Sequence, residues 1–129
     1  MRILLAEDDE LLGSGIRAGL AQNGFQVDWV RDGVAAEREL ATGAYQAAVL
    51  DLGLPRQDGM EVLRQVKATQ PDIEVIILTG HGNETDRETC MGLGAFAYLQ
   101  KPVDIDVLSE TMKQANEKIQ ARKQAQQGA

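Results

Sequence analysis

The stretch Ala47-Ala48-Val49-Leu50-Asp51 is followed at once by the turn Leu52-Gly53-Leu54-Pro55, and this order decides the fold. An unbroken apolar run before a turn is typical of a strand covered on both faces of a sheet. The glycine and the proline end that strand. Because Asp51 stands at the end of the run, we expect its carboxylate at the edge of a buried sheet.

A second acidic cluster, residues 7–9, ends another apolar run, Ile3–Ala6. If the two strands are neighbours, Glu7, Asp8 and Asp51 converge on one small volume. Like charges that lie this close need compensation. A hard divalent cation, which prefers oxygen ligands, is the simplest compensator. The sequence therefore predicts a metal site beside one exposed aspartate.

Length and charge restrict the class of protein. The chain has 129 residues, which is enough for one domain with its own core. Its 13 basic residues against 20 acidic ones give a net charge of −7, which argues against direct nucleic-acid binding, since such binding needs a basic face. Cys90 is the sole cysteine, which excludes an internal disulfide and a thiolate metal site.

Hydropathy predicts no contact with a membrane. No apolar run approaches the ~20 residues of a membrane span. The apolar stretch at the start of the chain is too short for a signal peptide, and we interpret it as a first strand. We therefore expect a cytoplasmic protein.

Apolar periodicity predicts strands that alternate with helices along the chain. The expected strands are residues 3–6, 25–30, 46–50, 73–78 and 95–99. The expected helices are residues 11–20, 33–40, 58–68, 84–93 and 104–119. This alternation predicts an α/β fold, a doubly wound five-stranded parallel sheet with helices on both faces.

Ligands of such sheets bind beyond the carboxyl ends of the strands. Chemically capable side chains follow several predicted strands at that edge: Glu7, Asp8, Asp51, Thr79 and Lys101. Two acids, a lone aspartate, a hydroxyl and a lysine would rarely meet there by chance. Asp9 falls one position past the acidic pair, so we assign it to the start of a helix.

Residues 1–119 are expected to form the domain, without an internal repeat. Residues 120–129 are polar and permit a helix, but offer nothing to bury. We expect them to form a polar extension of the last helix or the stub of a linker.

In this order, the motifs resemble the receiver domain of two-component response regulators over residues 2–119. The residues that carry the resemblance are 5–9, 51–55 with 58–59, 78–80 and 101–102. The resemblance implies the fold of the chemotaxis-type receivers, which is flavodoxin-like with strand order 2-1-3-4-5.

The resemblance also implies a reaction. Asp51 would accept a phosphoryl group from a phosphohistidine, with its carboxylate oxygen as the nucleophile. Mg²⁺ or Mn²⁺ would be bound directly by Asp8, Asp51 and the Gly53 carbonyl, and by Glu7 through water. Lys101, after a peptide bond to Pro102 that we expect to be cis, would bind the phosphate as a point charge.

The implied output is a change of conformation. Thr79 would turn its hydroxyl toward a phosphate oxygen, and Tyr98 would rotate inward. The surface of the fourth helix, fifth strand and fifth helix would then change. The implied partners are a histidine kinase or phosphotransfer protein and a downstream protein effector. The chain would be a monomer or a weak phosphorylation-dependent dimer, and not an enzyme beyond assisting its own phosphorylation and dephosphorylation.

Other origins and functions are open. Residues up to 64 resemble receivers attached to winged-helix DNA-binding domains, whereas residues 78–106 resemble nitrogen-regulation or stand-alone receivers. The chain could thus be a natural mosaic, a hybrid of two receivers or a fragment of a transcription regulator. A metal-dependent aspartate-nucleophile phosphatase needs an acid two residues after the nucleophile, where Gly53 stands. A flavin carrier needs a phosphate-binding loop where this chain has acids.

Plainer interpretations apply to single residues. Residues 7–9 could simply complement the dipole at a helix start. Tyr98 could be a half-buried strand aromatic, and His81 a loop residue without a role. We expect Trp29 to be an edge-strand aromatic, too distant to report metal binding.

Overall fold

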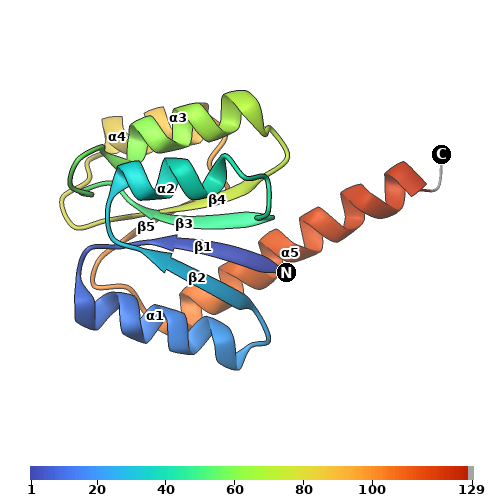
Figure 1. The fold of residues 1–129 in the computed structure, drawn as a ribbon, viewed down its shortest axis with the longest axis horizontal. Helices are drawn as coiled ribbons and strands as arrows, with labels where there is room; N and C mark the ends of the chain where they lie inside the picture. Colours follow the sequence, from blue (N-terminus) through green and yellow to red (C-terminus); the bar gives the residue numbers. More distant parts are fainter. Residues whose placement is uncertain (128–129) are drawn as a thin grey trace.

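The computed structural model describes residues 1–127. It contains a sheet of five parallel strands in the order β2-β1-β3-β4-β5 (Figure 1). The strands are β1 (Arg2–Ala6), β2 (Gln26–Val30), β3 (Ala47–Asp51), β4 (Glu74–Thr79) and β5 (Ala97–Gln100). The helices are α1 (Glu10–Gln22), α2 (Gly33–Leu40), α3 (Gly59–Thr69), α4 (Glu84–Gly92) and α5 (Ile105–Gln127). The predicted fold and strand order are confirmed.

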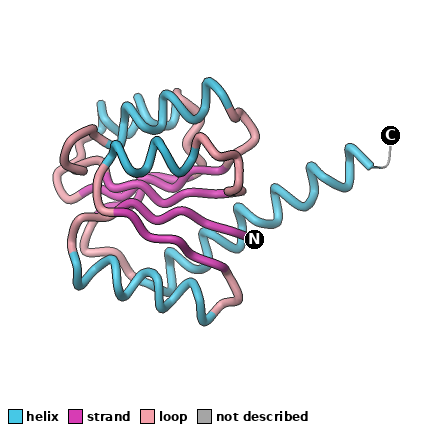
Figure 2. Tube along the Cα trace, viewed as in Figure 1, coloured by secondary structure: helices cyan, strands magenta, loops and turns pink. Residues whose placement is uncertain are grey.

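The sheet is the middle of three layers. Helices α1 and α5 cover one face, and α2, α3 and α4 cover the other (Figures 1 and 2). Successive strand side chains point to opposite faces, so each central strand contributes side chains to the two cores, one on each face of the sheet. Leu4 and Leu50 pack toward α2 and α3, whereas Leu5 and Val49 pack toward α1 and α5. This double burial explains the continuous apolar runs in the sequence.

The strand register places the ends of four strands at one edge of the sheet. Ala6 of β1 pairs with Leu50 of β3, so Glu7 and Asp51 follow at the same level. Thr79 at the end of β4 pairs with Gln100 of β5, and Lys101 comes next. The carboxyl ends of β1, β3, β4 and β5 therefore share one edge of the sheet.

Side-chain caps fix where the helices begin. Asp9 accepts a hydrogen bond from the Leu12 N–H at 2.8 Å, and Asp58 accepts one from the Glu61 N–H at 2.9 Å. Asp104 accepts one from the Asp106 N–H at 2.8 Å. Such caps satisfy main-chain donors that a helix start leaves free. The predictions that Asp9 and Asp104 begin helices are confirmed.

The last helix extends into the polar tail of the chain. Helix α5 continues to Gln127 and projects past the sheet (Figure 1), while residues 128–129 of the predicted tail lie outside the described residues. None of residues 120–127 is buried, but Arg122 is half-buried, and its guanidinium lies 3.1 Å from the buried carboxylate of Glu74. Lys118 lies 3.2 Å from the same carboxylate, so these two ion pairs attach the helix to β4.

Among residues 1–127, no helix combines the length and the apolar character that crossing a membrane requires.

Candidate functional site

The site is built around a lysine held between two carboxylates. Lys101 Nζ donates a hydrogen bond to Asp51 Oδ2 at 2.9 Å. The same ammonium lies 2.7 Å from Glu7 Oε1, off the direction of a hydrogen bond. Asp51 and Glu7 are both buried, and Lys101 is only partly exposed. The three side chains come from the ends of β3, β1 and β5, which the register places side by side.

Burial and charge give the two acids opposite pKa shifts. Burial, together with the nearby Asp51, raises the pKa of Glu7 to about 7, although Lys101 opposes the shift. Burial also acts to raise the pKa of Asp51, but the neighbouring Glu7 carboxyl and the hydrogen bonds from the Gly53 N–H and Lys101 outweigh it and lower that pKa. Asp51 is thus kept as the ionised carboxylate, which is the form that a nucleophile requires.

The acidic cluster suits a hard cation. Glu7, Asp8 and Asp51 each offer a carboxylate oxygen, and these atoms lie within 4.8 Å of one another. Glu7 Oε1 is buried and accepts no hydrogen bond from the described part of the chain. This oxygen is paired with the Lys101 ammonium, and it belongs to a group of three carboxylates, which is a donor set that Mg²⁺ or Mn²⁺ can use. The predicted ligand side chains are therefore brought together.

A depression of about 420 Å³ opens over Asp51 and is lined by Gly53, Thr79, His81, Asp86 and Lys101 among others. The Gly53 N–H donates to Asp51 Oδ1 at 2.9 Å and fixes the carboxylate. Thr79 is buried, and its hydroxyl oxygen accepts a hydrogen bond from the His81 main-chain N–H at 3.3 Å. The structure thus brings Thr79 and Lys101 to the same hollow as Asp51.

Tyr98 occupies an inward position. The ring packs against the core cluster beneath α3 and α4, and its hydroxyl is buried without a hydrogen-bond partner among residues 1–127. Burial raises the pKa of Tyr98, and the nearby Thr79 side chain opposes that shift. The resemblance implies that Tyr98 turns inward after a change at Asp51, whereas here its hydroxyl is already buried.

Position 59 requires a glycine because of a close contact that the sequence did not predict. A Cβ at this residue would overlap the Asp51 carbonyl oxygen and lie 2.9 Å from the Asp51 carbonyl carbon. Glycine therefore lets the start of α3 lie directly against the end of β3. The Asp-Gly pair at residues 58–59 was visible in the sequence, but the close approach was not.

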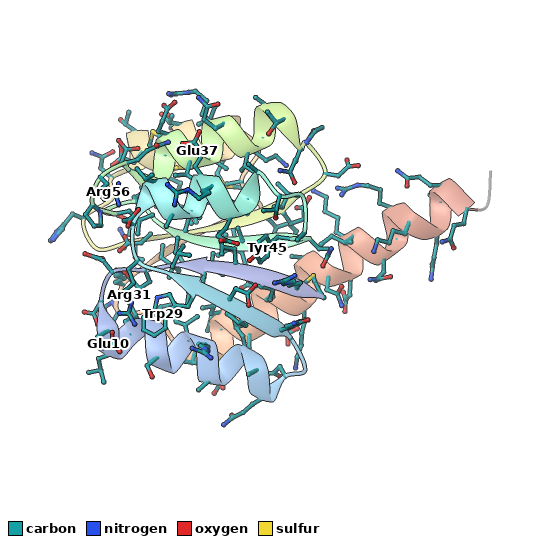
Figure 3. All side chains as sticks on the ribbon, viewed as in Figure 1. Glu10, Trp29, Arg31, Glu37, Tyr45 and Arg56 are labelled. Atoms are coloured by element: carbon teal, nitrogen blue, oxygen red, sulfur yellow. The ribbon has the colours of Figure 1, made fainter. Side chains whose placement is uncertain are left out.

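Trp29 lies on the edge strand β2, as expected from the sequence, and it also contacts the main chain of a site residue. Its indole Nε1 donates a hydrogen bond to the Glu7 carbonyl oxygen at 2.9 Å. The Arg31 guanidinium lies 4.1 Å from the centre of the Trp29 ring, and Arg31 is paired with Glu10. Figure 3 shows these labelled side chains gathered beside α1. No pattern in the sequence links position 29 to position 7, because only strand pairing joins β2 to β1.

A parallel sheet of this order, with an acidic cluster, an aspartate and a lysine at its carboxyl edge, defines the class of CheY-like receiver folds. A solved structure of a response regulator receiver domain protein from Clostridium thermocellum superimposes with a TM-score of 0.85. The two sequences are 30% identical, and the match covers 96% of this chain and 98% of that one.

The family model of the response regulator receiver domain matches residues 3–113, and the chain belongs to this family. Response regulator protein PmrA of Pseudomonas aeruginosa is 48% identical over 113 residues, which are 88% of this chain and 51% of that protein. Transcriptional regulatory protein QseB of Haemophilus influenzae is 46% identical over 102 residues, 79% of this chain and 46% of that protein. The chain thus spans about half the length of these relatives.

Proposed function

We propose that this chain is a phosphoaspartate switch of a two-component system, with Asp51 as the phosphoryl acceptor. The observation that carries the proposal is the contact of Lys101 Nζ with Asp51 at 2.9 Å, at a point where an acidic cluster with two buried members meets an open depression. Phosphoryl transfer depends mainly on positioning and on neutralisation of charge. A buried, ionised aspartate beside a lysine supports both requirements.

The transfer would proceed at the Asp51 carboxylate. One of its oxygens attacks phosphorus, the bond from phosphorus to its donor breaks, and the electron pair of that bond leaves with the donor. Lys101 contributes positive charge, and the Thr79 hydroxyl donates to a phosphoryl oxygen. Mg²⁺ or Mn²⁺, bound by Glu7, Asp8, Asp51 and the Gly53 carbonyl, would supply further neutralising charge.

The partners follow from the family. A histidine kinase or phosphotransfer protein would donate the phosphoryl group, and a protein effector would respond to the surface of α4, β5 and α5. Thr79 and Tyr98 would carry the change to that surface. On this proposal the chain works in the cytoplasm, as a monomer or a weak phosphorylation-dependent dimer, and residues 1–119 act as the switch domain.

The similarity to regulators twice as long supports a role as the receiver part of a transcription regulator. In that case the extended end of α5 leads toward an effector domain. A single relative that aligns over 113 residues spans both halves of the chain, which favours one continuous receiver over a hybrid of two.

Incubation with acetyl phosphate and Mg²⁺, followed by intact mass, tests the proposal. We expect one added phosphoryl group, lost when EDTA removes the metal and lost in Asp51→Asn. Asp58→Asn is the matched control, because that aspartate caps α3 outside the acidic cluster and should leave modification unchanged. Full modification of Asp51→Asn would refute Asp51 as the acceptor.

A further inference from the structure

Tyr98 is held inward beneath a glycine, and the fit leaves no room for a side chain. A Cβ at Gly82 would overlap the Tyr98 hydroxyl, lie 2.5 Å from Thr79 Cγ2 and lie 2.8 Å from Tyr98 Cζ. Real Cβ atoms do not approach other heavy atoms this closely. The loop between β4 and α4 therefore touches the ring with its main chain.

Backbone conformation does not explain the glycine. The glycines with positive φ among the described residues are Gly24, Gly43 and Gly94, so Gly82 has a backbone that an alanine can adopt. What excludes a side chain at position 82 is the space that Tyr98 and Thr79 occupy. The requirement for glycine here comes from packing against the predicted switch residues.

The loop is also tied down over the ring. The Gln100 side-chain amide donates a hydrogen bond to the Gly82 carbonyl at 3.3 Å. Gln100 lies on β5, two positions after Tyr98, so the same strand holds both the ring and the loop above it. Movement of the loop away from an added Cβ would break this bond, whereas rotation of the ring would not.

A depression next to the Tyr98 ring offers space for its rotation. This open depression of about 320 Å³ is lined by Gly82, Asn83, Glu84, Arg87, Tyr98 and Gln100. The buried Tyr98 hydroxyl makes no hydrogen bond within residues 1–127. Leaving a hydroxyl buried and unpaired has a cost that an outward rotation into water removes. The inward position is thus held by packing and opposed by solvation.

We propose that Gly82 is the positioning residue that sets the resting balance of Tyr98. Without a side chain at position 82 the ring rests inward before any modification, and a single methyl group there shifts the ring outward. This inference rests on the proposed function for its meaning in signalling, because the Tyr98 surface is the proposed output. The proposal itself concerns only the position of the Tyr98 ring, which is measured without phosphorylation.

The chain has two tyrosines, so ¹⁹F NMR of protein labelled with 3-fluorotyrosine resolves the question in the Tyr45→Phe background, where Tyr98 gives the single tyrosine signal. We expect a soluble gadolinium chelate to broaden the Tyr98 signal several-fold more in Gly82→Ala than in its parent. Gly92→Ala is the matched control, because a Cβ there meets nothing within 4 Å among the described residues. An unchanged Tyr98 signal in Gly82→Ala overturns the proposal.

A double-mutant cycle covers the case in which Gly82→Ala folds poorly. Gly82→Ala should lower the urea midpoint of unfolding more when Tyr98 is present than in the Tyr98→Ala background, where only the contact with Thr79 Cγ2 remains. Equal losses in both backgrounds would show that the loop itself needs glycine and would overturn the proposal. Phosphorylation of the same proteins by acetyl phosphate is scored separately, so absence of transfer to Asp51 refutes the proposed function and leaves the NMR result standing.

Discussion

The indole N–H of Trp29 donates a hydrogen bond to the main-chain carbonyl of Glu7, with 2.9 Å between the nitrogen and the oxygen. The ring is held by neighbours on both sides, since a Cβ at Gly13 would lie 2.9 Å from Trp29 Cη2 and Arg31 lies 4.1 Å from the ring centre. A residue of an outer strand therefore positions the main chain of a proposed metal ligand.

Trp29 is expected to report cation binding. It is the sole tryptophan of the chain, so a change in its fluorescence on addition of Mg²⁺ has one source. Asp8→Asn should abolish the change, and EDTA should reverse it. Trp29→Phe removes a hydrogen bond worth about 1 kcal/mol, so we expect a loss of about that size in the free energy of unfolding, measured with urea. Fluorescence that is indifferent to saturating Mg²⁺ would contradict this prediction.

Lys101→Ala should impair phosphorylation more than folding. The substitution leaves the carboxylates of Asp51 and Glu7 without their cation. Burial is the main cause that raises the pKa of Glu7 to about 7. Glu7 can therefore take up a proton, which limits the loss of stability. We expect a loss of about 2 kcal/mol in the free energy of unfolding, cooperative unfolding, and acetyl phosphate transfer at least tenfold slower. Loss of the folded state would instead identify a structural lysine.

The pH dependence of stability should contain a contribution from Asp28. The Tyr45 hydroxyl donates to Asp28 Oδ2 at 2.7 Å, and Arg2 pairs with the same oxygen at 2.7 Å. These two bonds lower the pKa of Asp28, the tyrosine bond most strongly. A lowered carboxyl pKa stabilises the fold above the unfolded pKa, which is about 4, and this stabilisation disappears as the pH falls through the folded pKa.

Asp28→Asn should therefore destabilise the protein at pH 7 and much less at pH 3. The Asp28 carboxylate is more than a third exposed, so solvent screens the pair and we expect a difference of about 1 kcal/mol or less. Urea unfolding at both pH values measures it. A difference as large at pH 3 as at pH 7 would mean that packing, and not charge, causes the loss.

Arg122→Ala should loosen the end of α5. Arg122 contacts the Glu74 carboxylate at 3.1 Å and donates to the Asp72 carbonyl at 2.8 Å, so its removal leaves buried Glu74 with Lys118 alone. A hydrogen bond to a charged group is worth about 1.5–3 kcal/mol, and we expect a loss near the lower figure. Amide exchange should become faster over residues 120–127, ahead of the rest of α5.

Arg64→Ala is the matched control for that prediction. Arg64 pairs with Glu61 one turn away on the exposed face of α3. Exposed pairs of this kind contribute about 0.5 kcal/mol or less. Equal destabilisation by the two substitutions would show that the Glu74 pairs are no stronger than ordinary surface pairs.

The sequence by itself determined the fold and the identity of the acidic cluster. Unbroken apolar runs such as Val75–Leu78 can be buried only in a sheet covered on both faces, and their alternation with amphipathic helices leaves the doubly wound arrangement. Since parallel strands end at one edge, Glu7, Asp51 and Lys101 had to meet there. These inferences depend on periodicity and chain direction, which are properties of the sequence.

Tertiary structure alone decided the contacts between residues that no periodicity connects. Trp29 reaches Glu7 across the pairing of β2 with β1, Arg122 reaches Glu74 from the end of a long helix, and Gly82 lies on Tyr98. Each depends on distances of a few ångströms between side chains or main chain far apart in sequence. A pattern of residue types carries no information on such distances, because the same glycine or arginine fits many surroundings until packing selects one.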